Sequence, residues 1–291
     1  MNTEIRDLMS RIEKCHDSMS KGQKAISDYI TKNYEKAAFM TASKLGNVVG
    51  VSESTVSRYA VLLGYNGYPE LQKAFQGMIK SRLTTLQRME LSVDADIGAI
   101  VKNVLKADIN NIKNTLEQVD ISSFDRIVKL ILGANRVFLL GLRSAAPVVE
   151  FMGYYMGFMM DNVFVVTSGV KDVLEQMVHL NEGDVLITVS FPRYAKRAVD
   201  ATELARSRGA KVIVITDSVF SPLIPISDEV LYAHSDMASF VDSLVAPLSL
   251  INALLLVVST QSKEKSMEKL EYLEGVWNKY GVYAHKEVKN N

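Results

Sequence analysis

The stretch DVLITVSFPRYAKRAVDATELARSRGAKVIVITD, residues 184–217, decides the fold of the C-terminal part of the chain. An apolar run over 185–189 stops at Ser190, a helical pattern follows, and a second apolar run spans 212–215. The stretch therefore predicts a strand, a turn, a helix and a second strand. In such units the turn after the first strand is where ligands bind.

The same alternation of apolar runs and helical patterns extends over much of the chain after residue 135. Further apolar runs lie at 137–140, 163–166 and 230–233. Continuous apolar strands separated by helices are typical of a parallel sheet that is covered on both faces. The sequence therefore predicts an α/β fold, namely a three-layer α/β/α domain with a parallel sheet.

Residues 1–90 show helical patterns only, and two short helices stand out among them. Thr41 begins the first helix, Gly50 closes it as a helix C-cap would, and Ser52 is a preferred N-cap residue for the second. Gly46 lies four residues before Gly50, and helices that cross closely need a small residue at their contact. Two short helices joined by a tight turn predict a helix-turn-helix.

The second of these helices presents short hydroxyl side chains and one arginine on its predicted outer face. Hydroxyls and the N–H groups of a helix start bind phosphates, and arginine binds a phosphate or a guanine edge. Residues 1–90 carry 13 Lys and Arg against 9 Asp and Glu, a mildly basic balance that suits an anionic partner. The alternative is a plain helical hairpin with a solvated polar face. The predicted DNA-binding residues are Ser52, Ser54, Thr55, Ser57 and Arg58.

The totals restrict the class of protein. The 291 residues are 48% hydrophobic and 23% charged, as in ordinary globular chains. The single cysteine excludes a disulfide framework, and the histidines lack metal-like spacing, so we expect no metal and no cofactor. The N-terminus lacks the apolar core of a signal peptide. Segment 240–259 contains Asp242, Pro247 and Asn252, which indicates a core or interface helix and a cytoplasmic protein without a membrane span.

Two regions of the chain carry a family resemblance. LGNVVGVSESTVSRYAVLLGYNGYPELQKAF (45–75) resembles the DNA-binding domain of the RpiR family of bacterial transcriptional regulators. NRVFLLGLRSAAPVVEFMGYYM (135–156) and GAKVIVITDSVFSPLIPISDEVL (209–231) resemble the SIS (sugar isomerase) domain of the same family, which binds phosphosugars. The resemblance implies that Ser52, Thr55 and Arg58 lie at the DNA. Gly46 stands where the family usually has Ala, and we expect that exchange to cost only some helix stability.

The turn after the apolar run at 185–189 departs from the family. Its phosphosugar version reads S-x-S-G-x-T, and here Pro192, Arg193 and Ala195 replace the second Ser, the Gly and the Thr. Two of three hydroxyls are lost, and an arginine fork, which suits a phosphate or a carboxylate, is gained. The alternative is that these cations are exposed helix-start charges without a ligand. Ser190, Arg193, Tyr194 and Lys196 are the predicted ligand residues of this turn.

A second predicted ligand turn follows the strand at 137–140. Gly141-Leu142-Arg143-Ser144 ends that strand and opens a helix, with Ser144 expected as its N-cap. Free N–H groups at a helix start form a general anion site. Arg143 and Ser144 therefore join the predicted ligand set, and the alternative is a capping serine beside a solvated arginine. The absence of further glycines excludes a dinucleotide-binding fingerprint.

These observations predict a DNA-binding regulator and not an enzyme. We expect a helix-turn-helix domain over 1–85, a linker helix over 86–120 and an SIS domain over 121–291 that senses a small anionic, sugar-derived effector. Its partners would be a palindromic DNA operator and a second copy, as a homodimer or a dimer of dimers. The alternative is a sugar-phosphate isomerase with an accessory helical domain; Glu150, Glu175 and His179 are available as bases, but no pattern singles out a catalytic residue. A pure scaffold would leave the helix-turn-helix unexplained.

Overall fold

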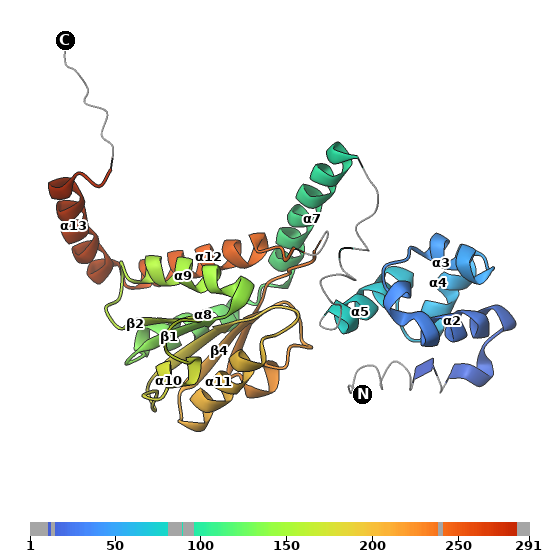
Figure 1. Ribbon diagram of the computed structural model, residues 1–291, viewed down its shortest axis with the longest axis horizontal. Helices are drawn as coiled ribbons and strands as arrows, with labels where there is room; N and C mark the ends of the chain where they lie inside the picture. Colours follow the sequence, from blue (N-terminus) through green and yellow to red (C-terminus); the bar gives the residue numbers. More distant parts are fainter. Residues whose placement is uncertain (1–10, 13–14, 81–88, 90–95, 238–240, 284–291) are drawn as a thin grey trace, which may run out of the picture. The chain divides into compact units, whose positions relative to one another are not determined.

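The computed structural model describes residues 11–12, 15–80, 89, 96–237 and 241–283. Its internal contacts divide the chain into two compact units, Met1–Asp94 and Ala95–Asn291, called the head and the body below (Figure 1). The division follows Asp94, so the helix that begins at Ile97 belongs to the body by its contacts.

The described part of the head is helical. It contains η1 (His16–Ser18), α2 (Lys21–Ala37), α3 (Ala42–Val49), α4 (Glu53–Leu62) and α5 (Tyr68–Lys80). These helices enclose one apolar core, in which the largest fully buried side chains are Tyr59, Phe75, Ile26, Ile30, Leu45 and Leu71. The predicted helix-turn-helix is the pair α3 and α4.

The body contains a five-stranded sheet in which every pairing is parallel, in the order β2-β1-β3-β4-β5. The strands are β1 (Val137–Gly141), β2 (Val163–Val166), β3 (Val185–Val189), β4 (Lys211–Thr216) and β5 (Glu229–Tyr232). The helices are α7 (Ile97–Gln118), α8 (Ile121–Gly133), α9 (Ala146–Met156), α10 (Val173–Gln176), α11 (Lys196–Ser207), α12 (Val245–Gln261) and α13 (Lys263–Tyr280), with short turns η2 (Arg143–Ala145) and η3 (Ile224–Ile226).

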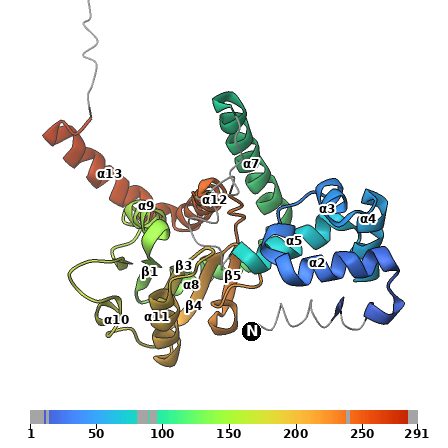
Figure 2. The same ribbon diagram turned by 45° about the vertical axis from the view of Figure 1, so that its right-hand side comes forward.

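Helices cover both faces of the sheet, because the strands are apolar on both faces. Leu139 and Ile187 face the core made with α8, α9 and α12, whereas Phe138 and Leu186 face the core made with α10 and α11. The two views show α9 and α12 on one side of the sheet and α10 and α11 on the other (Figures 1 and 2). The predicted fold class, a helix-turn-helix domain followed by an α/β/α domain with a parallel sheet, is confirmed.

The apolar segment that begins near residue 240 forms α12, which buries seven of its residues in the body. Among the described helices, no single one has both the length and the apolar composition of a membrane span, although α12 together with 266–280 reaches these values as a pair bent by 106°.

The backbone leaves no space for a side chain at position 46. An added Cβ on Gly46 would lie 2.7 Å from the carbonyl oxygen of Val51, because the turn folds back against α3 there. The same fold-back brings the Val51 N–H within 2.8 Å of the Gly46 carbonyl oxygen. Gly50, with φ of 79°, supplies the left-handed residue that ends α3. The turn between α3 and α4 thus depends on two glycines, one for space and one for conformation.

We expect Gly46→Ala to lower the free energy of unfolding by about 1–3 kcal/mol, the usual cost of forcing a methyl group into a packed contact. Urea unfolding of the full chain, followed by circular dichroism, measures it. Gly275→Ala in α13 is the control, because no atom lies within 4 Å of its added Cβ. Equal stability of the two variants would contradict the steric argument.

Candidate functional site

The first candidate surface is the N-terminal end of α4 in the head. Ser52 is its N-cap, and the Ser52 hydroxyl oxygen accepts a hydrogen bond from the N–H of Thr55 at 3.3 Å. The cap leaves the first turn of α4 at the surface, where a helix has its partial positive charge. This end of α4 can therefore receive an anion such as a DNA phosphate.

The structure brings four of the five predicted DNA-binding residues into one hydrogen-bonded group. The Ser52 hydroxyl lies 2.9 Å from that of Ser54 and 2.8 Å from that of Thr55. Arg58 lies along the same side, since its Nε donates to the Ser54 carbonyl oxygen at 3.2 Å. Ser52, Ser54 and Arg58 are exposed, whereas Thr55 and Ser57 are half-buried. The arginine and the hydroxyls thus form one polar surface that a groove edge can contact.

Thr55 also has a packing role that its sequence pattern does not reveal. Its methyl group lies 3.4 Å from the position a Cβ would take on Gly22 in α2. Behind it, the Ser27 hydroxyl donates to the Tyr59 hydroxyl at 3.1 Å, and burial raises the pKa of Tyr59 to about 12. Tyr59 therefore stays uncharged at neutral pH, and the charged side chains at the start of α4 are Arg58 and the exposed Glu53.

The second candidate surface lies at the carboxyl ends of β1 and β3. These strands are neighbours, with Gly141 opposite Val189, but their following helices cover opposite faces of the sheet. A crevice opens where neighbouring strands send their helices to opposite faces, and open α/β sheets bind ligands there. The two predicted ligand turns lie at this position, with 142–144 after β1 and 190–195 after β3.

Both turns contain an arginine with an unusual backbone. Arg143 has φ of 57° and Arg193 has φ of 67°, and among the described residues these are the non-glycine positions with positive φ. A left-handed backbone at a side-chain-bearing residue costs on the order of 1–3 kcal/mol and is concentrated at functional sites. Glycine would adopt the left-handed conformation without strain. The presence of arginine at both places therefore indicates a functional role for the guanidinium groups.

Ser190 is the buried polar group of this site. Its side chain is 5% exposed, its N–H donates to the Ile215 carbonyl oxygen at 3.1 Å, and its carbonyl accepts from the Thr216 hydroxyl at 2.8 Å. Its hydroxyl makes no hydrogen bond to any described residue. Buried hydroxyls are nearly always paired, so an open one at a ligand edge is available to a ligand.

Ser144 is not the N-cap that the sequence predicts. It lies inside η2, and α9 begins after Ala145, which makes no side-chain cap. The Ser144 hydroxyl instead donates to a carboxylate oxygen of Asp242 at 2.9 Å, across 98 residues of sequence. Asp242 is therefore a site residue that sequence reasoning missed, because the contact joins two distant segments and follows no local pattern.

The remaining predicted ligand residues, Tyr194 and Lys196, have different partners. The Tyr194 hydroxyl donates to Asp217 at 2.8 Å, and burial together with the charge of Asp217 raises the pKa of Tyr194 far above its usual range. Lys196 lies along α11 instead, where its Nζ donates to the Asp200 carboxylate at 2.8 and 2.9 Å. Asp217 was also missed, although an acid that follows an apolar strand directly is a usable signal.

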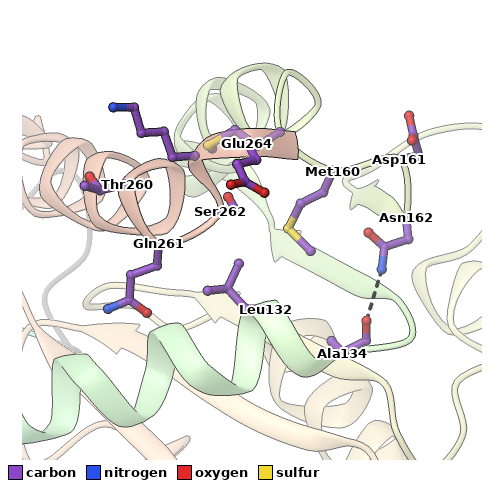
Figure 3. Close-up of a pocket in the computed structure, with 11 residues that line it drawn as sticks. Leu132, Ala134, Met160, Asp161, Asn162, Thr260, Gln261, Ser262 and Glu264 are labelled. Carbon is purple, nitrogen blue, oxygen red and sulfur yellow. Dashed lines mark hydrogen bonds between the residues drawn. The ribbon is translucent and has the colours of Figure 1, made fainter. Parts of the chain in front are cut away.

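A cavity of about 800 Å³ lies elsewhere, at the amino ends of β1 and β2 (Figure 3). Asn162 bridges this edge by donating to the Ala134 carbonyl oxygen at 3.1 Å. The cavity contains none of the predicted ligand residues and sits at the edge opposite to the one that parallel sheets use for ligands. The predicted ligand residues lie instead at the carboxyl ends of β1 and β3. The lining residues are Leu132, Ala134, Met159, Met160, Asp161, Asn162, Thr260, Gln261, Ser262, Lys263 and Glu264.

Comparison with known proteins gives a consistent family. The model of the helix-turn-helix domain of the rpiR family matches residues 6–82, and that of the SIS domain matches 130–257. The chain belongs to the RpiR family. It is a transcriptional regulator with a helix-turn-helix domain and an SIS domain, as the resemblance implied.

The relatives agree with this assignment. An HTH-type regulator of Clostridium perfringens is 22% identical over 91% of this chain and 95% of its own length. The regulator HexR of Pseudomonas aeruginosa is 25% identical over 75% of this chain and 76% of its own.

Two solved structures share the fold. The sugar isomerase domain of an RpiR transcription factor from Sphaerobacter thermophilus covers 60% of this chain and 97% of its own, with TM-score 0.58 and 28% identity. Vibrio vulnificus NanR, complexed with ManNAc-6P, covers 92% and 98%, with TM-score 0.54 and 21% identity.

The open hydroxyl of Ser190 leads to a stability prediction. We expect Ser190→Ala to leave the free energy of unfolding unchanged or to raise it, because the variant removes a buried polar group without a partner. Thr216→Val is the matched control: it removes the hydroxyl that donates to the Ser190 carbonyl and should lower stability by about 1–2 kcal/mol. Denaturant unfolding measures both, and a Ser190→Ala loss as large as that of the control would show that the hydroxyl is paired.

Proposed function

We propose that this regulator binds a palindromic operator through α4 as a homodimer, and that a small anionic, sugar-derived effector at the carboxyl edge of β1 and β3 controls this binding. The observation that carries the effector part is the pair of left-handed arginines, Arg143 and Arg193, in turns that follow neighbouring strands, together with the open hydroxyl of Ser190 at the end of β3. The DNA part rests on the polar surface of Ser52, Ser54, Thr55 and Arg58 at the start of α4.

On the DNA, the start of α4 would enter the major groove. The hydroxyls of Ser52 and Thr55 and the first N–H groups of the helix would contact phosphates, and these contacts set position. Arg58 would reach a base edge or a phosphate, and Ser57, half-buried on the same helix, would line the contact. Because one head carries one such helix, two copies related by a two-fold axis would read the two halves of a palindrome.

In the body, the guanidinium groups would bind the anionic end of the effector. Pro192 has no N–H to offer, and two family hydroxyls are missing from this turn, so the side chains of Arg193 and Ser190 would replace backbone donors. Tyr194 would form part of the wall, and Lys196 would add positive charge at the start of α11. Asp217 and Asp242 are acceptors that suit sugar hydroxyls, which supports a polyhydroxylated anion over a simple inorganic one.

The chemistry of the anion is a phosphate or a carboxylate, and NanR, solved with ManNAc-6P, supports a sugar phosphate. Planar carboxylates match one guanidinium fork as well as phosphates do, so a sugar acid such as gluconate is the other class. The names of the relatives favour regulation over the isomerase alternative.

Arg58→Ala tests the DNA assignment. An operator is first selected from random-sequence DNA with the unmodified protein, and affinity is then measured by mobility shift. We expect at least about a tenfold loss, since a desolvated arginine contact to a base contributes about 1–3 kcal/mol. Arg206→Ala, an exposed arginine of α11 in the body, is the chemical control and should bind as before. Undiminished binding by Arg58→Ala would exclude this surface.

Arg193→Ala tests the effector site. Thermal-shift titrations with N-acetylmannosamine 6-phosphate and with gluconate should identify the class that raises the melting temperature. We expect the variant to lose that shift, with an affinity lower by about tenfold or more, while its operator binding persists. Arg197→Ala is the control, because Arg197 is held by Asp172 at 3.2 Å. If Arg193→Ala retains the full shift, the anion binds elsewhere.

A further inference from the structure

Helix α7 attaches to the rest of the body by an unusual face. Its buried residues are both polar, Asn111 at 1% and Thr115 at 5% exposure. Helices of globular proteins normally bury an apolar stripe and expose a polar one. α7 is the first described helix after the head in the chain. A signal that travels along the chain from the body to the head would therefore pass through α7 and its contacts with the body. Its large exposed apolar residues are Ile97, Ile100, Val101, Val104, Leu105, Ile109, Ile112 and Leu116.

Hydrogen bonds to the segment after β5 hold this polar face. The Asn111 amide donates to the Asp236 carbonyl oxygen at 2.8 Å and accepts from the Asp236 N–H at 3.1 Å. The His234 N–H donates to the Thr115 hydroxyl at 2.9 Å. These hydrogen bonds specify one position for α7 on the body. Water can replace them when α7 moves, so they suit a helix that shifts between two positions.

The next contact of α7 leads to the ligand edge. The Ser243 hydroxyl donates to the Asp108 carboxylate at 2.6 Å, and the preceding residue, Asp242, accepts from Ser144 at 2.9 Å. Two successive residues therefore hold α7 with one side chain and the turn after β1 with the other. We call this pair the Asp242–Ser243 clasp.

We propose that the Asp242–Ser243 clasp transmits anion binding at the turn after β1 to α7. This inference rests on the proposed effector site. A bound anion would accept the Ser144 hydroxyl in place of Asp242, and its charge would repel the Asp242 carboxylate. Both effects break the same bond. Because Ser243 is covalently joined to Asp242, a shift of Asp242 changes the Ser243–Asp108 bond and loosens the attachment of α7.

This arrangement couples two sites through differential contacts, as allosteric control requires. A bound anion would compete with Asp242 for the Ser144 hydroxyl, so the effector would favour one of two positions of the clasp. Asp242 is thus a positioning residue for regulation in addition to a wall of the ligand site.

Amide hydrogen exchange of the full chain, without effector and without DNA, tests the clasp. We expect Ser144→Ala to speed exchange in α7 by about fivefold or more, although Ser144 makes no hydrogen bond to α7. Exchange in α11 and β4 should stay unchanged, which separates this effect from global destabilisation. Ser249→Ala, an exposed serine of α12, is the matched control. Unchanged exchange in α7 of Ser144→Ala would overturn the proposal.

A double variant separates a serial route from two independent contacts. Asp108→Ala should speed exchange in α7 on its own, and Ser144→Ala added to it should produce little further change, because the route is already broken. Full additivity would overturn the clasp. The hydrogen-exchange measurement needs neither an operator nor an effector. A failed operator selection or effector screen would therefore count against the proposed function, whereas the exchange rates of α7 would still test the clasp.

Discussion

The opposite directions in which α9 and α11 leave the sheet bring the two predicted ligand turns to the kind of position where open α/β sheets bind ligands. β1 and β3 are paired in register, with Gly141 opposite Val189, yet α9 covers one face and α11 the other. The chain folds back so closely after β1 that a Cβ on Gly141 would lie 2.6 Å from the Ala145 carbonyl oxygen. The two turns that carry the arginines therefore follow the carboxyl ends of the same pair of strands.

The head depends on a more local constraint. Its turn between α3 and α4 is closed by the space at Gly46 and the left-handed conformation of Gly50, and the Ser52 cap then fixes where α4 begins. Neighbouring residues make all of these contacts. For this reason the sequence alone was sufficient to predict the helix-turn-helix and its polar surface, whereas the close contact at Gly46 required the backbone itself.

The ligand edge was predicted in part. Continuous apolar runs indicate buried parallel strands. The positions of Arg143, Ser190 and Arg193 after β1 and β3 could therefore be predicted from these runs alone. The partners of these turns did not, because Asp242 meets Ser144 across 98 residues and Asp217 meets Tyr194 across 23. Tertiary contacts of this range leave no periodic trace in a single sequence. The same limit explains the error at Ser144, where a distant carboxylate takes the hydroxyl that a local cap would have used.

The ligand edge combines arginines with carboxylates, and this combination has a physical consequence for regulation. In the proposed mechanism an anion attracted by Arg143 and Arg193 would compete with Asp242 for Ser144, so binding would gain the arginine contacts and lose that hydrogen bond. A site of arginines alone would bind the anion more tightly but would undergo no compensating change elsewhere. In the proposed mechanism the carboxylate would lower affinity and in return make the occupied and empty states differ at α7, the helix that follows the head in the chain. A regulator needs that difference more than it needs tight binding, because only differential contact shifts an equilibrium.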